Sequence, residues 1–529
     1  MSTSSNRVVI IGGGHNGLVA AYYLAKAGHK PLVLERRNIA GGLAVTEELK
    51  PGFKVPTLAH SLGPILPSLV RDLGLEQLGL SMINPEVKVF APGKDGKSVT
   101  IFEDAARTAR ELGPVSARDA KMYPEFIASF AAIGKVLNPI LTMTPPSISE
   151  PSNSELWNLG LLGLKFRGLS KRDAFRLLRW GPMAVADLAS EWFETEALRA
   201  IVAARGIFGA GAGPWSAGTS AQLLLQAALD GHAIGTSVSV KGGIGALTQA
   251  LAKAATAAGA QIRTGAEVKE ITVSGGMVSG VVLTSGEEIP ASTVVSNADP
   301  RTTFMKLLDP TYLDPDFRFK IGNYRSKGSA AKVNLALSGL PAFNGAKDTS
   351  VLGGRIHIGP DIDYMERAFD ESKYGDFSPH PHMDIAIPSI ADPSLAPSGA
   401  HVMSIHVQYA PYKLKSGDWN SRREEFGDAV VKALADFAPN IAALIQARQV
   451  ITPLDMEQTY GLGGGHMLHG EPALDQLFTF RPMLGWAQYR TPIKGLYLCG
   501  SGSHPGGGIT GIPGMNASRE IVKDLKGKA

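Results

Sequence analysis

The 529-residue sequence predicts an α/β protein (α+β overall), and three observations lead to this class. A β-branched apolar run near the start leads directly into closely spaced glycines and a helical stretch, which is typical of a parallel sheet. A second glycine-rich turn, again followed by a helical stretch, lies far downstream. Between the two turns, helix-rich and strand-rich stretches occur without a fixed-period repeat. Apolar residues make up 44% of the chain, which is enough to form compact cores.

The first elements are a strand, a turn, a helix and a second strand. Residues 8–11 form the apolar run of a buried strand, and residues 12–17 fit the pattern G-x-G-x-x-G. Residues 18–27 read as a helix and residues 31–34 as the next strand. This order predicts a dinucleotide-binding unit, because a glycine motif alone is weak evidence and the full register is strong evidence.

Each residue type in this unit has a physical role. Gly12 permits the tight turn, Gly14 lets a pyrophosphate approach the backbone, and Gly17 lets the helix pack on the strand. Glu35 lies where a carboxylate accepts a hydrogen bond from the ribose, and it disfavours a 2′-phosphate. Arg36 follows directly and weakens that exclusion.

Two further glycine clusters favour FAD over NAD. One follows Glu35 and contains Gly41, Gly42 and Thr46. The other follows a strand at 495–500, and its backbone N–H groups suit the far end of an elongated cofactor. A helix that begins near Asn516 would add positive partial charge beside a reduced flavin, worth ~0.3–2 kcal/mol.

These segments resemble the FAD-dependent phytoene desaturase-like oxidoreductases of the wider amine oxidase and glutathione reductase superfamily. The likeness is strongest to the branch of pyridine nucleotide-disulfide oxidoreductase domain-containing protein 2. It is carried by residues 12–17, 240–245, 296–299, 463–482 and 499–514. The resemblance implies a Rossmann-type FAD-binding domain with an inserted substrate domain of mixed sheet and helices.

The resemblance also implies which residues bind the cofactor, with Val268 contacting adenine through its backbone. Leu43 stands where many relatives carry an arginine, and Ser501 stands where distant relatives carry an aspartate. We expect FAD to be bound non-covalently, because Cys499 lies on a strand that suits a buried small residue. The predicted cofactor-binding residues are Gly12, Gly14, His15, Asn16, Gly17, Glu35, Arg36, Gly41, Gly42, Thr46, Val268, Gly500, Ser501, Gly508, Gly511 and Ile512.

The FAD-binding domain is predicted to be discontinuous, formed by residues 1–75, 232–305 and 455–529. The substrate-binding domain, with a helical lid, would comprise residues 76–231 and 306–454. Residues 156–180 combine apolar and basic side chains. Such a segment can lie on an anionic membrane, but we favour a lid whose basic side is simply solvated.

Four residues are candidates for an acid or base that handles the second proton: His504, His469, His466 and Glu471. His466 and His469 are three residues apart, but the surrounding glycines favour a loop near the flavin over a metal pair, so no metal is expected. His380 and His382 lie in a proline-rich stretch and are expected to be exposed.

The leading hypothesis is an FAD-dependent oxidoreductase that desaturates C–C bonds of a bulky apolar, isoprenoid-like substrate by hydride transfer to flavin. One alternative is an amine oxidase, for which Trp486, Tyr489 and Tyr460 would supply aromatic residues beside the flavin. Another is a non-enzymatic FAD-fold regulator that binds a partner protein. Without a second dinucleotide motif, the electron acceptor is expected to be oxygen, a quinone or a protein.

The composition limits the functions and the cellular location that we expect. The formal net charge of +4 is too small to predict nucleic-acid binding, and the single cysteine excludes a C-x-x-C redox pair. No run of ~18 apolar residues predicts a spanning helix. We expect a cytoplasmic protein, with peripheral membrane contact left open.

Overall fold

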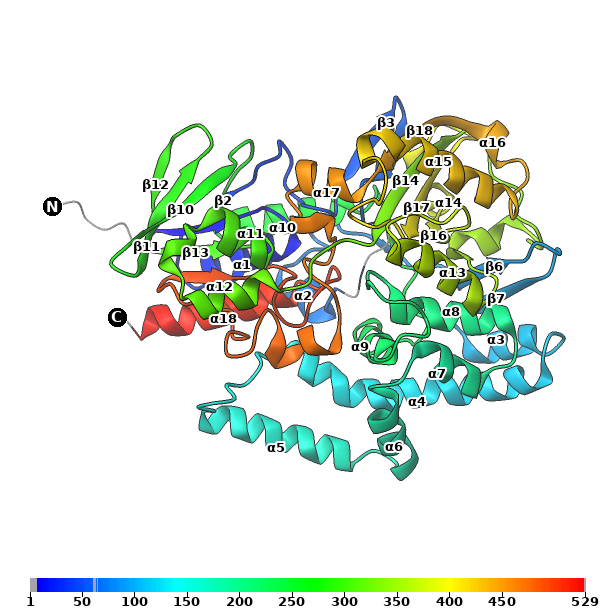
Figure 1. The fold of residues 1–529 in the computed structure, drawn as a ribbon, viewed down its shortest axis with the longest axis horizontal. Helices are drawn as coiled ribbons and strands as arrows, with labels where there is room; N and C mark the ends of the chain where they lie inside the picture. The colour runs from blue at the N-terminus through cyan, green and yellow to red at the C-terminus, as the bar shows by residue number, and fades with distance from the viewer. Residues whose placement is uncertain (1–6, 60–62, 64, 528–529) are drawn as a thin grey trace.

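A five-stranded sheet carries the first glycine-rich turn. The computed structural model describes residues 7–59, 63 and 65–527, and Figure 1 shows its fold. The strand order is β19-β13-β1-β2-β9, and the pairings are parallel. The strands span β1 Val8–Ile11, β2 Leu32–Leu34, β9 Gln261–Arg263, β13 Thr293–Ser296 and β19 Leu496–Leu498. The sheet therefore joins the beginning, middle and end of the chain.

Three helices from equally distant parts of the chain pack with this sheet. They are α1 His15–Lys26, α10 Gly245–Ala257 and α18 Ile512–Lys526, and they share one apolar core with β1. Helices α1 and α18 approach closely, because a Cβ on Gly514 would lie only 2.1 Å from the Asn16 carbonyl oxygen. This contact brings the two predicted glycine-rich turns together.

A smaller antiparallel sheet packs on the other side of the parallel sheet. It consists of β10 Val268–Ser274, β11 Met277–Leu283 and β12 Glu288–Pro290, and it contributes to a second apolar core. Gly275 and Gly276 have positive φ angles in the turn between β10 and β11. Short helices follow: α11 Pro300–Thr302, η1 Thr303–Leu307, η2 Pro310–Tyr312 and α12 Pro315–Gly322.

A seven-stranded mixed sheet forms the second half of the molecule. Its order is β18-β14-β17-β16-β15-β6-β7. One face is apolar and packs with α15 Trp419–Ala435 and α16 Ile441–Leu444. The strands are β6 Val87–Pro92, β7 Ser98–Phe102, β14 Ala330–Leu337, β15 Arg355–Ile358, β16 His382–Ala386, β17 His401–Gln408 and β18 Ile445–Ile451.

A layer of helices lies beside this sheet (Figure 1). Tyr123, Phe126 and Phe130 on the long helix α4 lie in its apolar core. Helix α4 is also long and apolar enough to cross a membrane, by length and composition only. The helices are α3 Ala105–Leu112, α4 Ala117–Thr142, α6 Lys171–Trp180, α7 Val185–Trp192, α8 Glu196–Ile207 and α9 Thr219–Asp230. Helix α5 Asn153–Arg167 lies at the edge of the molecule and has no buried residue (Figure 1).

The remaining elements connect these layers. They are α2 Pro67–Asp72, α13 Ile362–Lys373, α14 Pro388–Ala391, α17 Pro453–Tyr460, β3 Thr46–Lys50, β4 Phe53–Pro56, β5 Met82–Ile83, β8 Ser239–Val240, η3 Thr349–Gly353, η4 Pro393–Leu395, η5 Gly463–Gly465, η6 Leu474–Gln476 and η7 Phe478–Phe480. The five-stranded sheet draws its strands from 1–75, 232–305 and 455–529, and the seven-stranded sheet from 76–231 and 306–454. The domain boundaries themselves stay a prediction.

Two local predictions were wrong. The last helix begins at Ile512 instead of near Asn516, because Gly511 supplies a left-handed cap and Pro513 is well suited to a first helical turn. His382 is buried on strand β16, where its ring lies 5.0 Å from that of His357, while His380 is exposed as expected. A proline-rich stretch predicts a loop, but it does not locate the strand that follows.

Candidate active site

One cavity of about 750 Å³ is lined by residues from both glycine-rich turns. Its walls include Gly14 and Glu35 from the start of the chain, and Ser501 and Gly508 from its end. Across it, the Asn16 side-chain amide donates a hydrogen bond to the Ser501 hydroxyl at 3.3 Å. The two ends of the chain thus form one continuous site.

The first turn is built by close backbone packing. A Cβ on Gly17 would lie 2.2 Å from the carbonyl oxygen of Gly12, so only glycine lets the helix approach there. Gly12 itself has a φ of +93°, which is the left-handed region that favours glycine. The Gly13 N–H donates to the Glu35 carboxylate at 2.8 Å, and so fixes that side chain at the end of β2.

The glycine cluster that follows Glu35 packs against this first turn. The Gly41 N–H donates to the Gly13 carbonyl at 2.9 Å, while Gly42 lines the cavity. Thr46 is engaged elsewhere, because its hydroxyl accepts the Gly245 N–H at 2.9 Å and so holds the start of α10.

The predicted residues therefore divide into two groups. Ten line the cavity, and six shape the loops and helices behind its wall. The ten are Gly12, Gly14, His15, Asn16, Glu35, Arg36, Gly42, Val268, Ser501 and Gly508. The six are Gly17, Gly41, Thr46, Gly500, Gly511 and Ile512. Their part in binding the cofactor stays a prediction.

The cavity fits FAD by its size and by its unused polar atoms. His15 Nε2, Asn16 Oδ1 and His469 Nδ1 are buried without a hydrogen-bond partner in the described chain. A buried polar atom without a partner costs ~1–3 kcal/mol, so a ligand that contacts these atoms would be stabilised. At the other end, Val268 and Arg36 line the wall, and Arg36 pairs with Glu267 at 3.0 Å.

Of the four acid–base candidates, only His469 lines the cavity. Its backbone φ is +58°, which is uncommon for a residue with a side chain. Burial lowers the pKa of His469 below its usual value, and burial lowers the pKa of the neighbouring His15 to about 4. Both imidazoles are therefore neutral near pH 7, and they present no positive charge to the cavity.

The other three candidates do not line this cavity and have partners within the protein, and their role as acids or bases stays a prediction. His504 Nε2 is bonded to the Ile140 carbonyl at 2.9 Å, and His504 lines neither this cavity nor the smaller one beside it. His466 accepts the Leu468 N–H at 3.2 Å through Nδ1. Glu471 forms an ion pair with Arg325 at 2.5 Å, so its charge is already compensated.

Arg481 is a functional residue that sequence reasoning did not single out. Its guanidinium is fully buried and donates to the Ser501 carbonyl at 2.7 Å and to the Leu468 carbonyl at 3.0 Å. Further bonds reach the carbonyls of Gly470, Glu471 and Gln476. Arg481 therefore joins the loop of His469 to the C-terminal glycine-rich loop. The only signal for this residue in the sequence was the Arg481-Pro482 pair.

Three more wall residues come from outside the predicted set. Asn297 donates from its amide to the Gly12 carbonyl at 3.2 Å. His406 and Phe208 lie at the opposite end of the cavity, with ring centroids 4.7 Å apart. Their positions depend on strand β17 and on the end of α8, which no short motif reveals.

A smaller cavity of about 130 Å³ adjoins the first and shares Gly63, Phe208, Leu468 and Gly508 with it. Part of its wall is aliphatic, formed by Leu141, Leu225, Leu229, Leu468 and Leu477. Another part is charged, formed by Arg205, Asp230, Arg355 and Asp384. The aliphatic part is supplied by α4, α9 and two loops.

The aromatic residues considered for an amine site do not assemble one. Tyr489 is fully buried and donates to the His504 carbonyl at 2.9 Å. Trp486 packs on Phe317, and Tyr460 lines the first cavity with the Arg37 guanidinium over its ring.

Cys499 is buried in the core and is absent from the cavity wall, and burial raises its pKa. Residues 7–59, 63 and 65–527 contain no group of three potential metal ligands.

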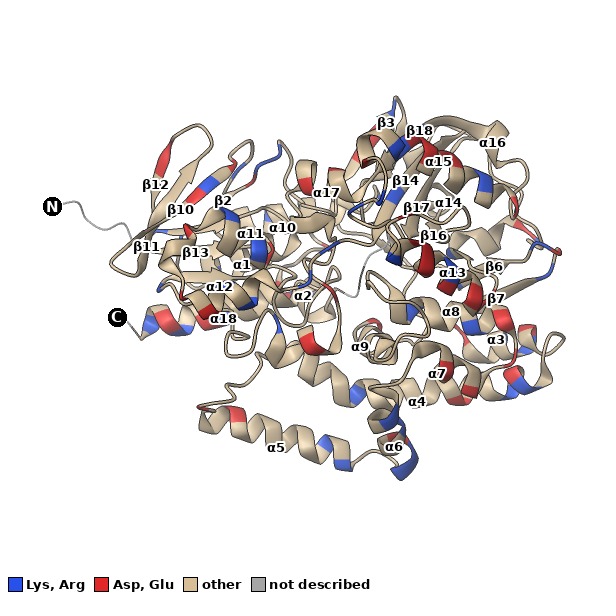
Figure 2. Ribbon diagram, viewed as in Figure 1, with Lys and Arg blue, Asp and Glu red and all other residues tan. Residues whose placement is uncertain are grey.

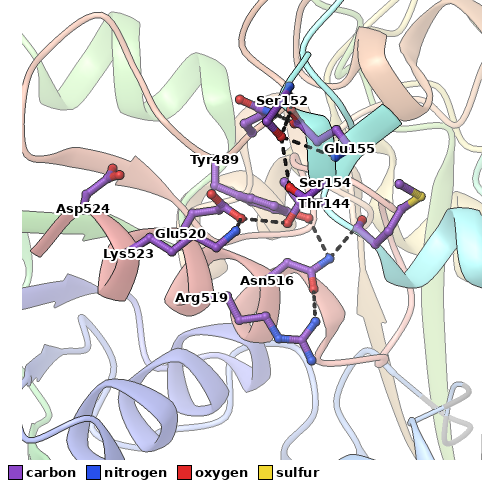
Figure 3. A network of polar contacts seen from close by, with 12 residues as sticks. Thr144, Ser152, Ser154, Glu155, Tyr489, Asn516, Arg519, Glu520, Lys523 and Asp524 are labelled. Atoms are coloured by element: carbon purple, nitrogen blue, oxygen red, sulfur yellow. Dashed lines mark hydrogen bonds and ion pairs between the residues drawn. The ribbon is translucent and has the colours of Figure 1, made fainter. Parts of the chain in front are cut away.

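The region behind the C-terminal loop is anchored by polar contacts (Figure 3). Asn516 donates to the Tyr489 hydroxyl at 3.1 Å and to the Met143 carbonyl at 3.2 Å. The Thr144 hydroxyl donates to Glu520 on α18 at 3.2 Å. The end of α4, which also supplies Leu141, is thereby held against α18.

Comparison with known proteins gives a consistent picture. The profile of a family described as "Flavin containing amine oxidoreductase" matches residues 17–514. The chain is 35% identical to pyridine nucleotide-disulfide oxidoreductase domain-containing protein 2 of Rattus norvegicus, over 98% of this chain and 93% of that protein. It is 26% identical to a neurosporene-forming phytoene desaturase of Cereibacter sphaeroides, over 99% and 95%.

The fold is also found among solved structures. A putrescine oxidase has a TM-score of 0.61 with 15% identity, and the match covers 99% of both chains. At that identity the likeness concerns the fold alone. The family match identifies FAD as the cofactor.

Proposed function

Because the chain belongs to the family of flavin-containing amine oxidoreductases, we propose that it desaturates C–C bonds of a bulky, largely apolar substrate such as an isoprenoid. That it is an FAD-dependent oxidoreductase follows from the family itself. The aliphatic wall of the second cavity, beside Gly508, is the observation that carries the finer proposal. FAD, when bound, supplies the centre that accepts a hydride.

The residues of this chain bind and orient the substrate, and they exclude water from the site. Leucines on α4 and α9 face the cavity next to the C-terminal glycine-rich loop, so an alkyl or alkenyl chain there gains burial energy of ~25 cal/mol per Å². His15 and His469 are neutral, so neither imidazole adds a positive charge to the first cavity. Electrons would leave to oxygen, a quinone or another protein.

The test is anaerobic bleaching of the flavin absorbance by a panel of isoprenoids, fatty compounds and amines. We expect bleaching with an apolar substrate and none with amines. Bleaching by amines, with release of hydrogen peroxide in air, would instead identify an amine oxidase. A flavin that no compound reduces, in a protein that binds a partner, would favour a regulator.

We also propose that α5 and α6 contact an anionic membrane. Trp157 is 70% exposed, and Leu164, Phe175 and Leu178 are exposed by more than 60% each. Figure 2 shows Lys and Arg positions, in blue, where α5 meets α6. Arg172, Arg176 and Arg179 pair with Glu125 and Glu191.

Helices α5 and α6 also carry three basic residues for which no ion pair is found among the described residues, so they remain available to lipid headgroups. They are Lys165, Arg167 and Lys171. Each adds ~1 kcal/mol near an anionic surface. The start of α5 is anchored to the segment before β19, since Glu155 accepts the Gln488 side-chain amide at 2.6 Å. An apolar substrate could then pass from the bilayer toward the end of α4.

Vesicle flotation tests this contact. We expect binding to vesicles that contain phosphatidylglycerol and weak binding to phosphatidylcholine alone. Trp157→Ser with Leu164→Ser should abolish flotation, while Phe319→Ser, at a residue 71% exposed on α12, should not. Equal flotation of all variants would contradict the proposal.

A further inference from the structure

The seven-stranded sheet has one apolar face and one polar face, and both are buried. On β14, β17, β16 and β15 the apolar side chains alternate with polar ones, and the apolar set packs with α15. The other face carries a row of titratable residues in register across four strands: Lys332, His406, Asp384 and His357. A face that only had to pack against helices would be apolar, so this row indicates a polar ligand nearby.

Part of this polar face reaches the two cavities. His406 lines the first cavity, and Asp384 and Arg355 line the second. Opposite them, Arg205 on α8 and Asp230 on α9 complete the charged part of the second cavity. An apolar chain that enters beside Gly508 therefore meets charged groups within the same small cavity.

The charges in this cavity form two ion pairs. Asp230 pairs with Arg205 at 2.5 Å, and Asp384 pairs with Arg355 at 2.5 Å. Each guanidinium keeps one N–H unused, because the Nε atoms of both arginines have no acceptor in the described chain. A ligand that offers acceptor atoms to these two N–H groups would be stabilised.

A neighbouring histidine, His232, is neutral near pH 7. Burial is the largest cause that lowers its pKa to about 4, and the nearby cations Lys88, Arg355 and Arg205 lower it further, against an opposing effect of Glu103. Lys88 is itself buried, whereas its partner Glu103 is 67% exposed and screened by water. His232 therefore adds no charge of its own beside these ion pairs.

We propose that the substrate is an amphiphile with a carboxylate at one end of its apolar chain, bound by Arg205 and Arg355. A carboxylate has two acceptor oxygens, so it can take one Nε–H hydrogen bond from each arginine. The chain then runs along Leu225 and Leu229 toward Gly508, where the oxidation takes place. This inference rests on the proposed function, and it narrows the substrate class to carboxylated apolar compounds.

Ligand titration of the FAD-loaded protein tests the proposal without turnover. Decanoic acid, methyl decanoate and decylamine are the probes, and perturbation of the flavin absorbance is the readout. We expect decanoic acid to bind at least tenfold more tightly than the ester and the amine. Equal binding of the three, binding that favours the amine, or no binding of the acid would overturn the proposal.

Variants then locate the carboxylate. Arg205→Gln with Asp230→Asn removes one opposite pair without leaving an unpaired charge, and the acid preference should fall to about twofold or less. Arg355→Gln with Asp384→Asn is the second variant, should the first fail to fold. The exposed pair Arg263 and Glu287, changed together to Gln, is the matched control and should keep the full preference.

A preference for the acid that survives in both folded pair variants would also overturn the proposal. Failure of the carboxylate site and failure of the proposed function are distinguishable. If the enzyme does not oxidise apolar compounds, bleaching fails for the isoprenoids and fatty compounds of the panel, whereas the ratio of acid to ester affinity is measured independently of turnover.

Discussion

Replacing Gly17 by alanine should disrupt cofactor binding through a single misplaced methyl group. The new Cβ would lie 2.2 Å from the Gly12 carbonyl oxygen, against a closest normal approach near 3.0 Å. The turn must therefore move by most of an ångström. The same carbonyl accepts the Asn297 amide, and the Gly12 N–H donates to the Leu34 carbonyl at 2.8 Å, so the shift also disturbs two neighbouring strands.

The magnitude follows from opposing effects. Overpacking of this kind costs ~1–3 kcal/mol, while alanine in place of glycine inside a helix gains ~1 kcal/mol. Loss of one hydrogen bond to a charged pyrophosphate costs a further ~1.5–3 kcal/mol of binding. We expect the Kd for FAD to rise at least about tenfold, because 1.4 kcal/mol corresponds to a factor of ten.

The assay is reconstitution of the apoprotein with FAD, followed by the loss of flavin fluorescence. Gly163→Ala on α5 is the matched control, since no atom lies within 4 Å of the position that its new methyl group would occupy. It should leave FAD affinity unchanged and stability equal or slightly higher. If Gly17→Ala binds FAD as tightly as the unmodified protein, close packing at this turn does not control cofactor binding.

Three other substitutions or conditions have definite expected outcomes. Arg481→Lys keeps the charge but cannot serve all of its carbonyl partners, so thermal unfolding should show a loss of at least about 2 kcal/mol; unchanged melting would contradict this. Lowering the pH from 7 to 5 should reduce the free energy of unfolding in urea. His15, His466 and His504 have pKa values lowered to about 4, 3 and 4, so below pH 6.5 the unfolded chain binds protons that the folded chain does not. Each contributes up to ~1.4 kcal/mol per pH unit, and a flat profile would refute their burial as neutral groups. Lys332→Met should raise the free energy of unfolding at pH 7, because burial holds the pKa of Lys332 well below its usual value; a loss of stability in urea would contradict this.

Elements with short-range signals were predicted closely. The strand, turn, helix and strand predicted within residues 8–34 correspond to β1, α1 and β2. Glycine spacing and the alternation of apolar residues are local properties, so they can be recognised in a single sequence. The start of α18 was misplaced because Ile512, Pro513 and Gly514 read as loop residues, although Gly511 supplies the cap.

The side chains of the site were harder to assign. His504 and Glu471 were predicted as acids or bases, and that role stays a prediction; each has a partner in the folded chain that the sequence does not reveal. Arg481 was overlooked for the converse reason, since its carbonyl partners belong to loops that converge only in space. Whether a polar side chain is available for chemistry depends on which neighbours already satisfy it.

The sequence by itself determined the cofactor class and the nucleotide-binding turn, because closely spaced glycines and a trailing acid must act within one strand–turn–helix unit. Only the tertiary structure decided what faces the substrate. Arg205, Arg355 and Asp384 come from a helix and two strands far apart in the chain. Strand register and helix packing bring them to one cavity, and no local pattern encodes that convergence.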